Sequence, residues 1–143
     1  MSGKRSKSRQ LALQALYQWQ LASSNIKDII QQFKDDEEPN SYEEEYFSDL
    51  IRGVPTHLNE LDDALAPYLD RAIASVDPVE RAALRLGAYE LLHHPEVPYR
   101  VVINEAVELT KIFGAEEGHK YINGVLDKLA KKLRPVEANA ASK

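Results

Sequence analysis

The residues best suited to bind a charged ligand stand at the very start of the chain. Lys4, Arg5, Lys7 and Arg9 place four positive charges among the first nine residues, with no acidic side chain between them. Of the 18 basic residues, the other 14 are outnumbered by 23 acidic ones, and the formal net charge is −5. Because salt screens charges beyond about 8 Å, a short basic arm can bind a polyanion although the whole protein is acidic. The charge pattern alone fits a solvated tail equally well.

A second polar group stands between two apolar periodicities near the C-terminus. Apolar residues recur at helical spacing from Val102 to Phe113 and from Ile122 to Leu133, which predicts a helical hairpin. Gly114 should end the first of these helices with a positive φ. The corner between the helices is available for contact and carries charged and aromatic side chains: Glu117, His119, Lys120 and Tyr121.

Candidates for catalysis are few. Glu90 projects into the apolar face of a helix predicted from Pro78 to about His93, and burying an unpaired carboxylate is costly. We expect a structural role with a partner for Glu90, and a catalytic acid is the alternative. The four histidines (His57, His93, His94 and His119) show no recognisable metal-ligand spacing, and the common phosphate-loop, zinc-protease and nucleophile motifs do not occur. The sequence therefore predicts no catalytic residue, no metal and no cofactor.

Two apolar side chains lie on the polar face of the first helix, which is predicted from Ser8 to about Ser23. Tyr17 and Leu21 project among glutamines, opposite the face that carries Leu16 and Trp19. Tyrosine is enriched at protein interfaces, so the pair indicates a partner surface. The alternative is that a neighbouring segment covers both side chains within the same chain.

The elements that position these residues are predicted to be helices only. We expect an all-α fold of about seven helices in one domain over residues 1–135, with two packed halves at about 1–75 and 76–134. Residues 136–143 are expected to be a disordered tail. Helix starts are predicted at Asn25, at Ser41 with Glu44 as a capping box, and at Asp77 before Pro78.

The composition of the chain indicates in which cellular compartment the protein works. The chain has no cysteine, no secretory leader pattern and no apolar run near the roughly 18 residues of a membrane-spanning helix. The sequence therefore predicts a cytoplasmic protein without a membrane partner.

Several ordered segments of the chain resemble the NusB family of transcription antitermination factors. The signature is carried by residues 102–111 (VINEAVELTK), 113–116 (FGAE) and 121–127 (YINGVLD). Residues 14–20 (QALYQWQ), 47–54 (FSDLIRGV) and 84–91 (LRLGAYEL) agree with it. The resemblance runs from about Arg9 to Pro135, which is nearly the whole chain.

The resemblance implies a NusB-like bundle without catalysis that binds the single-stranded boxA element of RNA together with NusE, a small-subunit ribosomal protein. The complex promotes read-through by the RNA polymerase elongation complex with other Nus factors, notably in ribosomal RNA operons. Carried over to this chain, the basic arm and the corner from Glu117 to Tyr121 would bind RNA. Tyr17 and Glu80, with Leu21 beside them, would bind NusE.

Two other functions compete with this interpretation. One is a helical interaction module that binds only proteins and whose arm makes no RNA contact. The other is an enzyme centred on Glu90 or on the His93–His94 pair.

Overall fold

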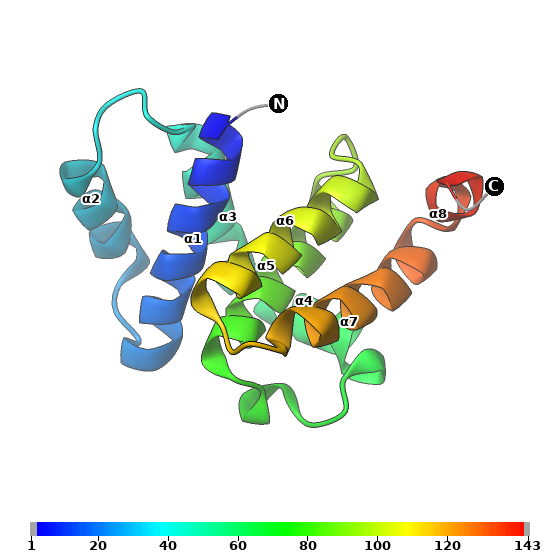
Figure 1. The fold of residues 1–143 in the computed structure, drawn as a ribbon. Helices are drawn as coiled ribbons and strands as arrows, with labels where there is room; N and C mark the ends of the chain where they lie inside the picture. The colour runs from blue at the N-terminus through cyan, green and yellow to red at the C-terminus, as the bar shows by residue number, and fades with distance from the viewer. Residues whose placement is uncertain (1–2, 142–143) are drawn as a thin grey trace.

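The computed structural model describes residues 3–141 and folds them into eight α-helices and two 3₁₀ turns (Figure 1). The α-helices are α1 (Gly3–Ala22), α2 (Ile26–Asp36), α3 (Glu44–Thr56), α4 (Leu58–Leu65), α5 (Pro78–His93), α6 (Tyr99–Phe113), α7 (Gly118–Leu133) and α8 (Pro135–Ala141). The 3₁₀ turns are η1 (Ala66–Tyr68) and η2 (Ile73–Ser75). The all-α prediction is confirmed. None of the described helices is long and apolar enough to cross a membrane.

α5 is the central helix of the fold. It packs against α1, α3, α4, α6 and α7, and all its residues from Ala82 to Leu91 are buried. Gly87 allows the close approach of α7, because a Cβ there would lie 2.7 Å from a methyl carbon of Leu126. A helix buried on several sides is mostly apolar around its circumference, which explains the run of Ala and Leu in this segment.

The helices form two groups, and α1 contacts both. Phe47 of α3 is fully buried in the first group, where it packs against Phe33 at 5.6 Å and Tyr42 at 5.8 Å between ring centroids. α4 packs mainly against α5 and α7, so it belongs with the second group. α4 therefore packs with helices that follow it in the sequence, although it lies before residue 75.

Two of the three predicted helix starts are confirmed. The Asn25 side chain accepts hydrogen bonds from the backbone of Lys27 and Asp28, and the Asp77 side chain does the same for Val79 and Glu80. The capping box at Ser41 was wrong, since α3 begins at Glu44 and its N-cap residue is Glu43. The backbone of Glu43 instead bonds to the buried Ser8 of α1. The Ser8 hydroxyl donates to the Glu43 carbonyl and accepts from the Glu43 N–H, both at 2.8 Å.

Three further expectations need correction. α1 begins at Gly3, five residues before the predicted start, so the basic arm forms its first two turns. Gly114 ends α6 as predicted, but with an extended backbone at φ −100°, and an added Cβ there would lie 2.9 Å from the Thr110 carbonyl. The expected disordered tail is helical up to residue 141, while residues 142 and 143 lie outside the described part.

α8 is held in place by packing and by one carboxylate. Ala138 is 1% exposed, and Glu137 accepts a hydrogen bond from the backbone N–H of Tyr99 at 2.7 Å. This bond satisfies a donor in the first turn of α6, which has no side-chain cap of its own. The C-terminal segment therefore completes the start of α6.

Candidate nucleic-acid and partner surfaces

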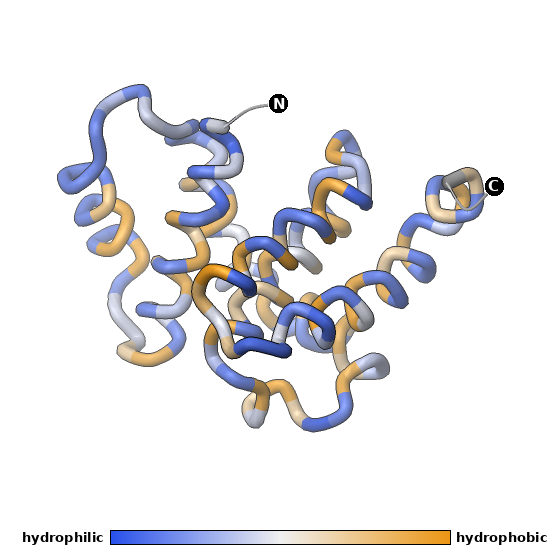
Figure 2. Tube along the Cα trace, viewed as in Figure 1, coloured by the Kyte–Doolittle hydropathy of each residue, from blue (hydrophilic) through white to orange (hydrophobic). Residues whose placement is uncertain are grey.

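Two of the cations on the basic arm pair with acids from the connection between α2 and α3. Arg5 contacts Glu43 at 2.9 Å and lies 4.2 Å from the ring centroid of Tyr46, while Lys7 lies 3.6 Å from Glu37. The side chains of Arg5 and Lys7 are each 37% exposed, and Lys4 is exposed. The connection lies next to the start of α1 and is mostly hydrophilic (Figure 2). Part of the arm's positive charge is thus balanced within the protein.

Arg9 lies in the interior and is the partner of Glu90. The guanidinium donates three hydrogen bonds of 2.9–3.1 Å to the Glu90 carboxylate and one of 3.1 Å to Glu105. The hydroxyl of Tyr46 also donates to Glu90. Arg9 is 4% and Glu90 2% exposed, so Arg9 cannot contact RNA without leaving the core. The structural role expected for Glu90 is confirmed.

The environment keeps the Arg9 guanidinium charged. Burial alone would lower the pKa of the Arg9 guanidinium, but hydrogen bonds to Glu90 and its negative charge outweigh burial and raise that pKa. Burial, followed by the charge of Glu90, raises the pKa of the Tyr46 hydroxyl, which remains a donor. The Glu90 carboxylate is 2% exposed and accepts hydrogen bonds from both Arg9 and Tyr46, so a substrate cannot reach it, which argues against Glu90 as a catalytic acid.

The corner between α6 and α7 carries one partly buried ring and several exposed charges. The backbone N–H of Asp70 donates to the Tyr121 hydroxyl at 3.3 Å, and the guanidinium of Arg71 lies 5.7 Å from the Tyr121 ring centroid. Lys120 pairs with Glu117 at 2.8 Å, with both side chains about 70% exposed. His119 lies 3.1 Å from the carbonyl of Glu116. Arg71, which no motif of the sequence indicates, adds a guanidinium beside the ring and pairs with Asp70 at 2.7 Å.

The arm and the corner form two separate patches. The arm contacts residues of α3 and the connection before it, whereas Tyr121 contacts residues 70 and 71. Figure 1 shows the first turns of α1 at the top of the view and the α6–α7 corner near its lower middle. Arg9 reaches α6 at Glu105, which precedes Phe113 by about 12 Å along the helix. A ligand that contacts both patches must therefore be extended.

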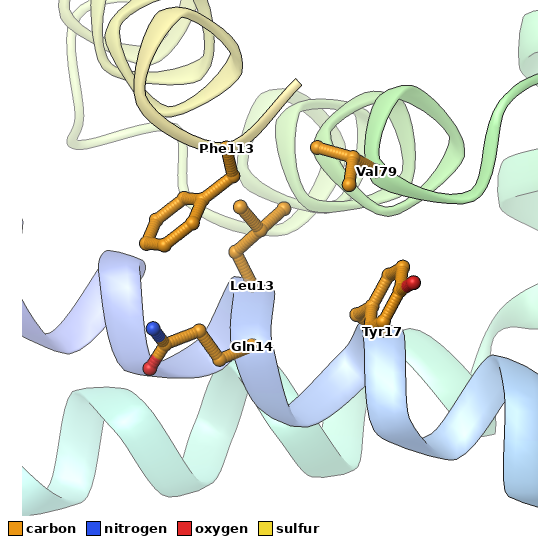
Figure 3. A pocket seen from close by; sticks show the side chains of 5 residues that line it. All are labelled: Leu13, Gln14, Tyr17, Val79 and Phe113. Atoms are coloured by element: carbon orange, nitrogen blue, oxygen red, sulfur yellow. The ribbon is translucent and has the colours of Figure 1, made fainter. Parts of the chain in front are cut away.

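A shallow apolar hollow adjoins the predicted partner residue Tyr17. Its lining comes from the middle of α1, the start of α5 and the end of α6, namely Leu13, Gln14, Tyr17, Val79 and Phe113 (Figure 3). The volume of the hollow is about 250 Å³. Tyr17 is 40% and Leu21 55% exposed. No neighbouring segment covers either residue fully in the described part of the chain.

Glu80 follows the hollow residue Val79 but faces the corner. A Cβ at Gly118 would lie 2.5 Å from a carboxylate oxygen of Glu80, so the glycine allows α7 to start against this side chain. Burial, followed by the charge of Asp77, raises the pKa of Glu80. The carboxylate is partly exposed, and it lies between the hollow and the corner.

The histidines gather in a way that their spacing in the sequence did not reveal. The rings of His57 and His93 lie 4.2 Å apart between centroids and are tilted by 33°, and Glu60 lies within 3.4 Å of a nitrogen of each. His94 turns away to Asp49 and Glu96. In the sequence, only the three-residue spacing of His57 and Glu60 indicated this cluster. His93 joins it because α5 packs against α4.

Comparison with known proteins gives one consistent family. A model of the NusB family matches residues 6–131. Transcription antitermination protein NusB of Nitrosococcus oceani is 55% identical over 137 residues, covering 96% of this chain and 92% of the relative. The protein of the same name in Pseudomonas fluorescens is 52% identical over 139 residues, covering 97% of this chain and 84% of the relative.

Solved structures agree with the sequence matches. NusB of T. maritima aligns with a TM-score of 0.83 at 31% identity, covering 98% of this chain and 99% of that one. A crystal structure of antitermination factors NusB and NusE in complex with dsRNA aligns with a TM-score of 0.79 at 29% identity, covering 92% of this chain and 99% of that one. The likeness therefore extends over nearly the whole fold.

Proposed function

Because the chain belongs to the NusB family, we propose that it is a transcription antitermination factor that binds single-stranded boxA RNA together with NusE. It helps the RNA polymerase elongation complex, with other Nus factors, to read through terminators, notably in ribosomal RNA operons. It acts in the cytoplasm by binding and without catalysis. One observation carries this proposal: the fold matches, over 92% of this chain, a structure that contains NusB, NusE and RNA.

The corner supplies the stacking part of the proposed RNA surface. Proteins hold single strands with cations along the backbone and with aromatic rings on which bases stack. Tyr121 is fixed at its hydroxyl end by the backbone of Asp70, and the exposed Lys120 lies next to it in the chain. His119 and Glu117 border the same surface, where Glu117 orients Lys120.

The arm supplies the electrostatic part of the surface through Lys4, Arg5 and Lys7. Arg9 was grouped with them on sequence grounds, and the proposed surface leaves it out because it is buried against Glu90. Arg71 takes its place as a cation, next to the corner rather than on the arm. A strand that follows both patches contacts α1 first and Tyr121 last, or the reverse.

Replacing Tyr121 with alanine should weaken boxA RNA binding by the complex with NusE about 5- to 150-fold, since base stacking contributes roughly 1–3 kcal/mol. Fluorescence anisotropy with labelled boxA RNA measures the change. Tyr121→Phe keeps the ring and should bind nearly as well as the wild type, which separates stacking from the hydrogen bond of the hydroxyl.

The competing protein-only module predicts a different result. In that case NusE binds normally, but labelled boxA RNA binds no better to the complex than to NusE alone. If folded Tyr121→Ala binds RNA as tightly as the wild type, the result contradicts only the role of the corner and leaves RNA binding by the protein in place. The two failures are therefore distinguishable.

The hollow beside Tyr17 forms the proposed NusE surface, with Leu21 and Glu80 at its edges. Truncating an aromatic residue at the centre of an interface to alanine commonly weakens the binding free energy by about 2 kcal/mol or more. Tyr17→Ala should therefore weaken NusE binding about 30-fold in isothermal titration calorimetry. Val101→Ala is the matched control, because Val101 is also 40% exposed but lies at the opposite end of α6 from Phe113. Equal losses in both variants would refute the assignment.

A further inference from the structure

We propose that His57, Glu60 and His93 form a binding site for a divalent transition metal ion, of which zinc is the best fit. The nitrogen Nδ1 of His57, a carboxylate oxygen of Glu60 and the nitrogen Nε2 of His93 all lie within 4.8 Å of one another. Two imidazoles and one carboxylate are a common donor set for zinc, with water in the remaining position. This site is independent of the proposed RNA and NusE surfaces.

The distances between the three donor atoms suit a single ion. Two ligand atoms on a tetrahedral zinc ion are about 3.3 Å apart, given metal–ligand distances near 2.0–2.1 Å. The Glu60 oxygen lies 3.4 Å from His57 Nδ1 and 2.9 Å from His93 Nε2. The two imidazole nitrogens need to approach by at most about 1.5 Å from the 4.8 Å limit. Side chains that are 29–50% exposed have room for this movement.

The three ligands come from different elements that the fold holds rigidly together. His57 joins α3 to α4, where its backbone N–H bonds to Gly53 and its carbonyl accepts from Leu61. Glu60 follows one turn later on α4, and His93 is the last residue of α5. Tyr89 supports His93 from one turn earlier, because the two rings stack at 5.0 Å with an angle of 28°. A bound ion would therefore link the end of α5 to the α3–α4 junction.

Access and charge also favour a cation. An open hollow borders the site and is lined by residues 55–60, so an ion can enter from solvent. One carboxylate oxygen of Glu60 lies against a ring nitrogen of both imidazoles, at 3.4 Å from His57 and 2.9 Å from His93. A divalent ion binds all three groups together. Both imidazoles bind the ion through a ring nitrogen that carries no proton.

Isothermal titration calorimetry with zinc chloride alone tests the site, using tag-free protein that has been treated with a chelator. The wild type should bind one zinc ion per chain, and saturating zinc should raise its melting temperature by roughly 5–10 °C. His57→Ala and His93→Ala should each lower the affinity at least about 10-fold and abolish most of the thermal shift. Glu60→Gln keeps the shape of the side chain but removes its charge, and it should also bind more weakly.

His119→Ala is the matched control, since His119 is a partly exposed histidine at the distant α6–α7 corner. It should bind zinc as the wild type does. The unfolding midpoint of each variant without metal shows that the fold is intact. No saturable binding to wild type, or equal binding by wild type and the His57→Ala/His93→Ala double variant, would overturn the proposal.

Discussion

Replacing Arg9 with methionine should lower the free energy of unfolding by about 3–5 kcal/mol, which is a large fraction of the stability of a domain this size. The reason is the carboxylate left behind, since Glu90 is 2% exposed and receives three hydrogen bonds from Arg9. Without the guanidinium, Glu90 must either remain charged in the core or take up a proton on folding. Chemical denaturation followed by circular dichroism measures the change.

A surface ion pair provides the control for this prediction. Lys131 lies 3.1 Å from Asp127 on α7, and the two side chains are 62% and 44% exposed. Exposed pairs of this kind contribute about 0.5 kcal/mol or less, so Lys131→Met should change little. Removing the buried network, with Arg9→Met, Glu90→Leu and Tyr46→Phe together, should restore much of the stability, because Glu105, which also loses its hydrogen bond from Arg9, has a side chain that is 25% exposed to solvent. A single Arg9→Met variant as stable as the wild type would contradict the argument.

Arg134→Met should cost about 3 kcal/mol, through a different mechanism. Arg134 follows α7 and is 8% exposed. Its guanidinium donates to the backbone carbonyls of Glu90, Leu91, His94 and Val97, at and beyond the end of α5. The Leu91 carbonyl lies in the last turn of α5, where carbonyls lack partners inside the helix, and hydrogen bonds from a charged donor contribute about 1.5–3 kcal/mol each.

Lys132→Met is the matched control for Arg134→Met, because Lys132 is an exposed cation only two residues away. It should alter the free energy of unfolding by a few tenths of a kcal/mol at most. Because Arg134 also contacts Glu137 at 3.3 Å, the Arg134 variant should release α8 as well. Faster amide hydrogen exchange in residues 136–141 would report that release. Unchanged exchange and stability would refute the proposed role of this arginine.

The periodic apolar pattern was sufficient to predict the helices, and what it missed depends on contacts between distant residues. The sequence indicated that Glu90 needs a partner but could not identify Arg9, which lies 81 positions away. The sequence around Ser41 has the pattern of a capping box. The backbone N–H of Glu43, at the start of α3, instead donates to Ser8 on another helix, which no local pattern can indicate. α8 looked disordered because neither its burial at Ala138 nor the role of Glu137 at α6 has a local signal.

The candidate sites were predictable to different degrees. Tyr17 and Leu21 were identified correctly as exposed apolar residues, because helical geometry alone places them on the polar face. The basic arm was found by composition, but composition cannot distinguish exposed Lys4 from buried Arg9. The cluster of His57, Glu60 and His93 could not be found by spacing, since two of its members are 36 residues apart and meet only when α4 packs on α5.

The acidic connection beside the arm has a consequence for how RNA binding must be measured. Ordinarily each phosphate neutralised on a single strand releases condensed counterions, and it contributes about −0.7 to the slope of log affinity against log salt. Here Arg5 and Lys7 already have Glu43 and Glu37 as partners. When a phosphate replaces one of these carboxylates, the freed acid gathers new cations from the buffer. The slope will therefore undercount the phosphates that the protein contacts. A shallow salt dependence does not mean that the arm makes few contacts with RNA.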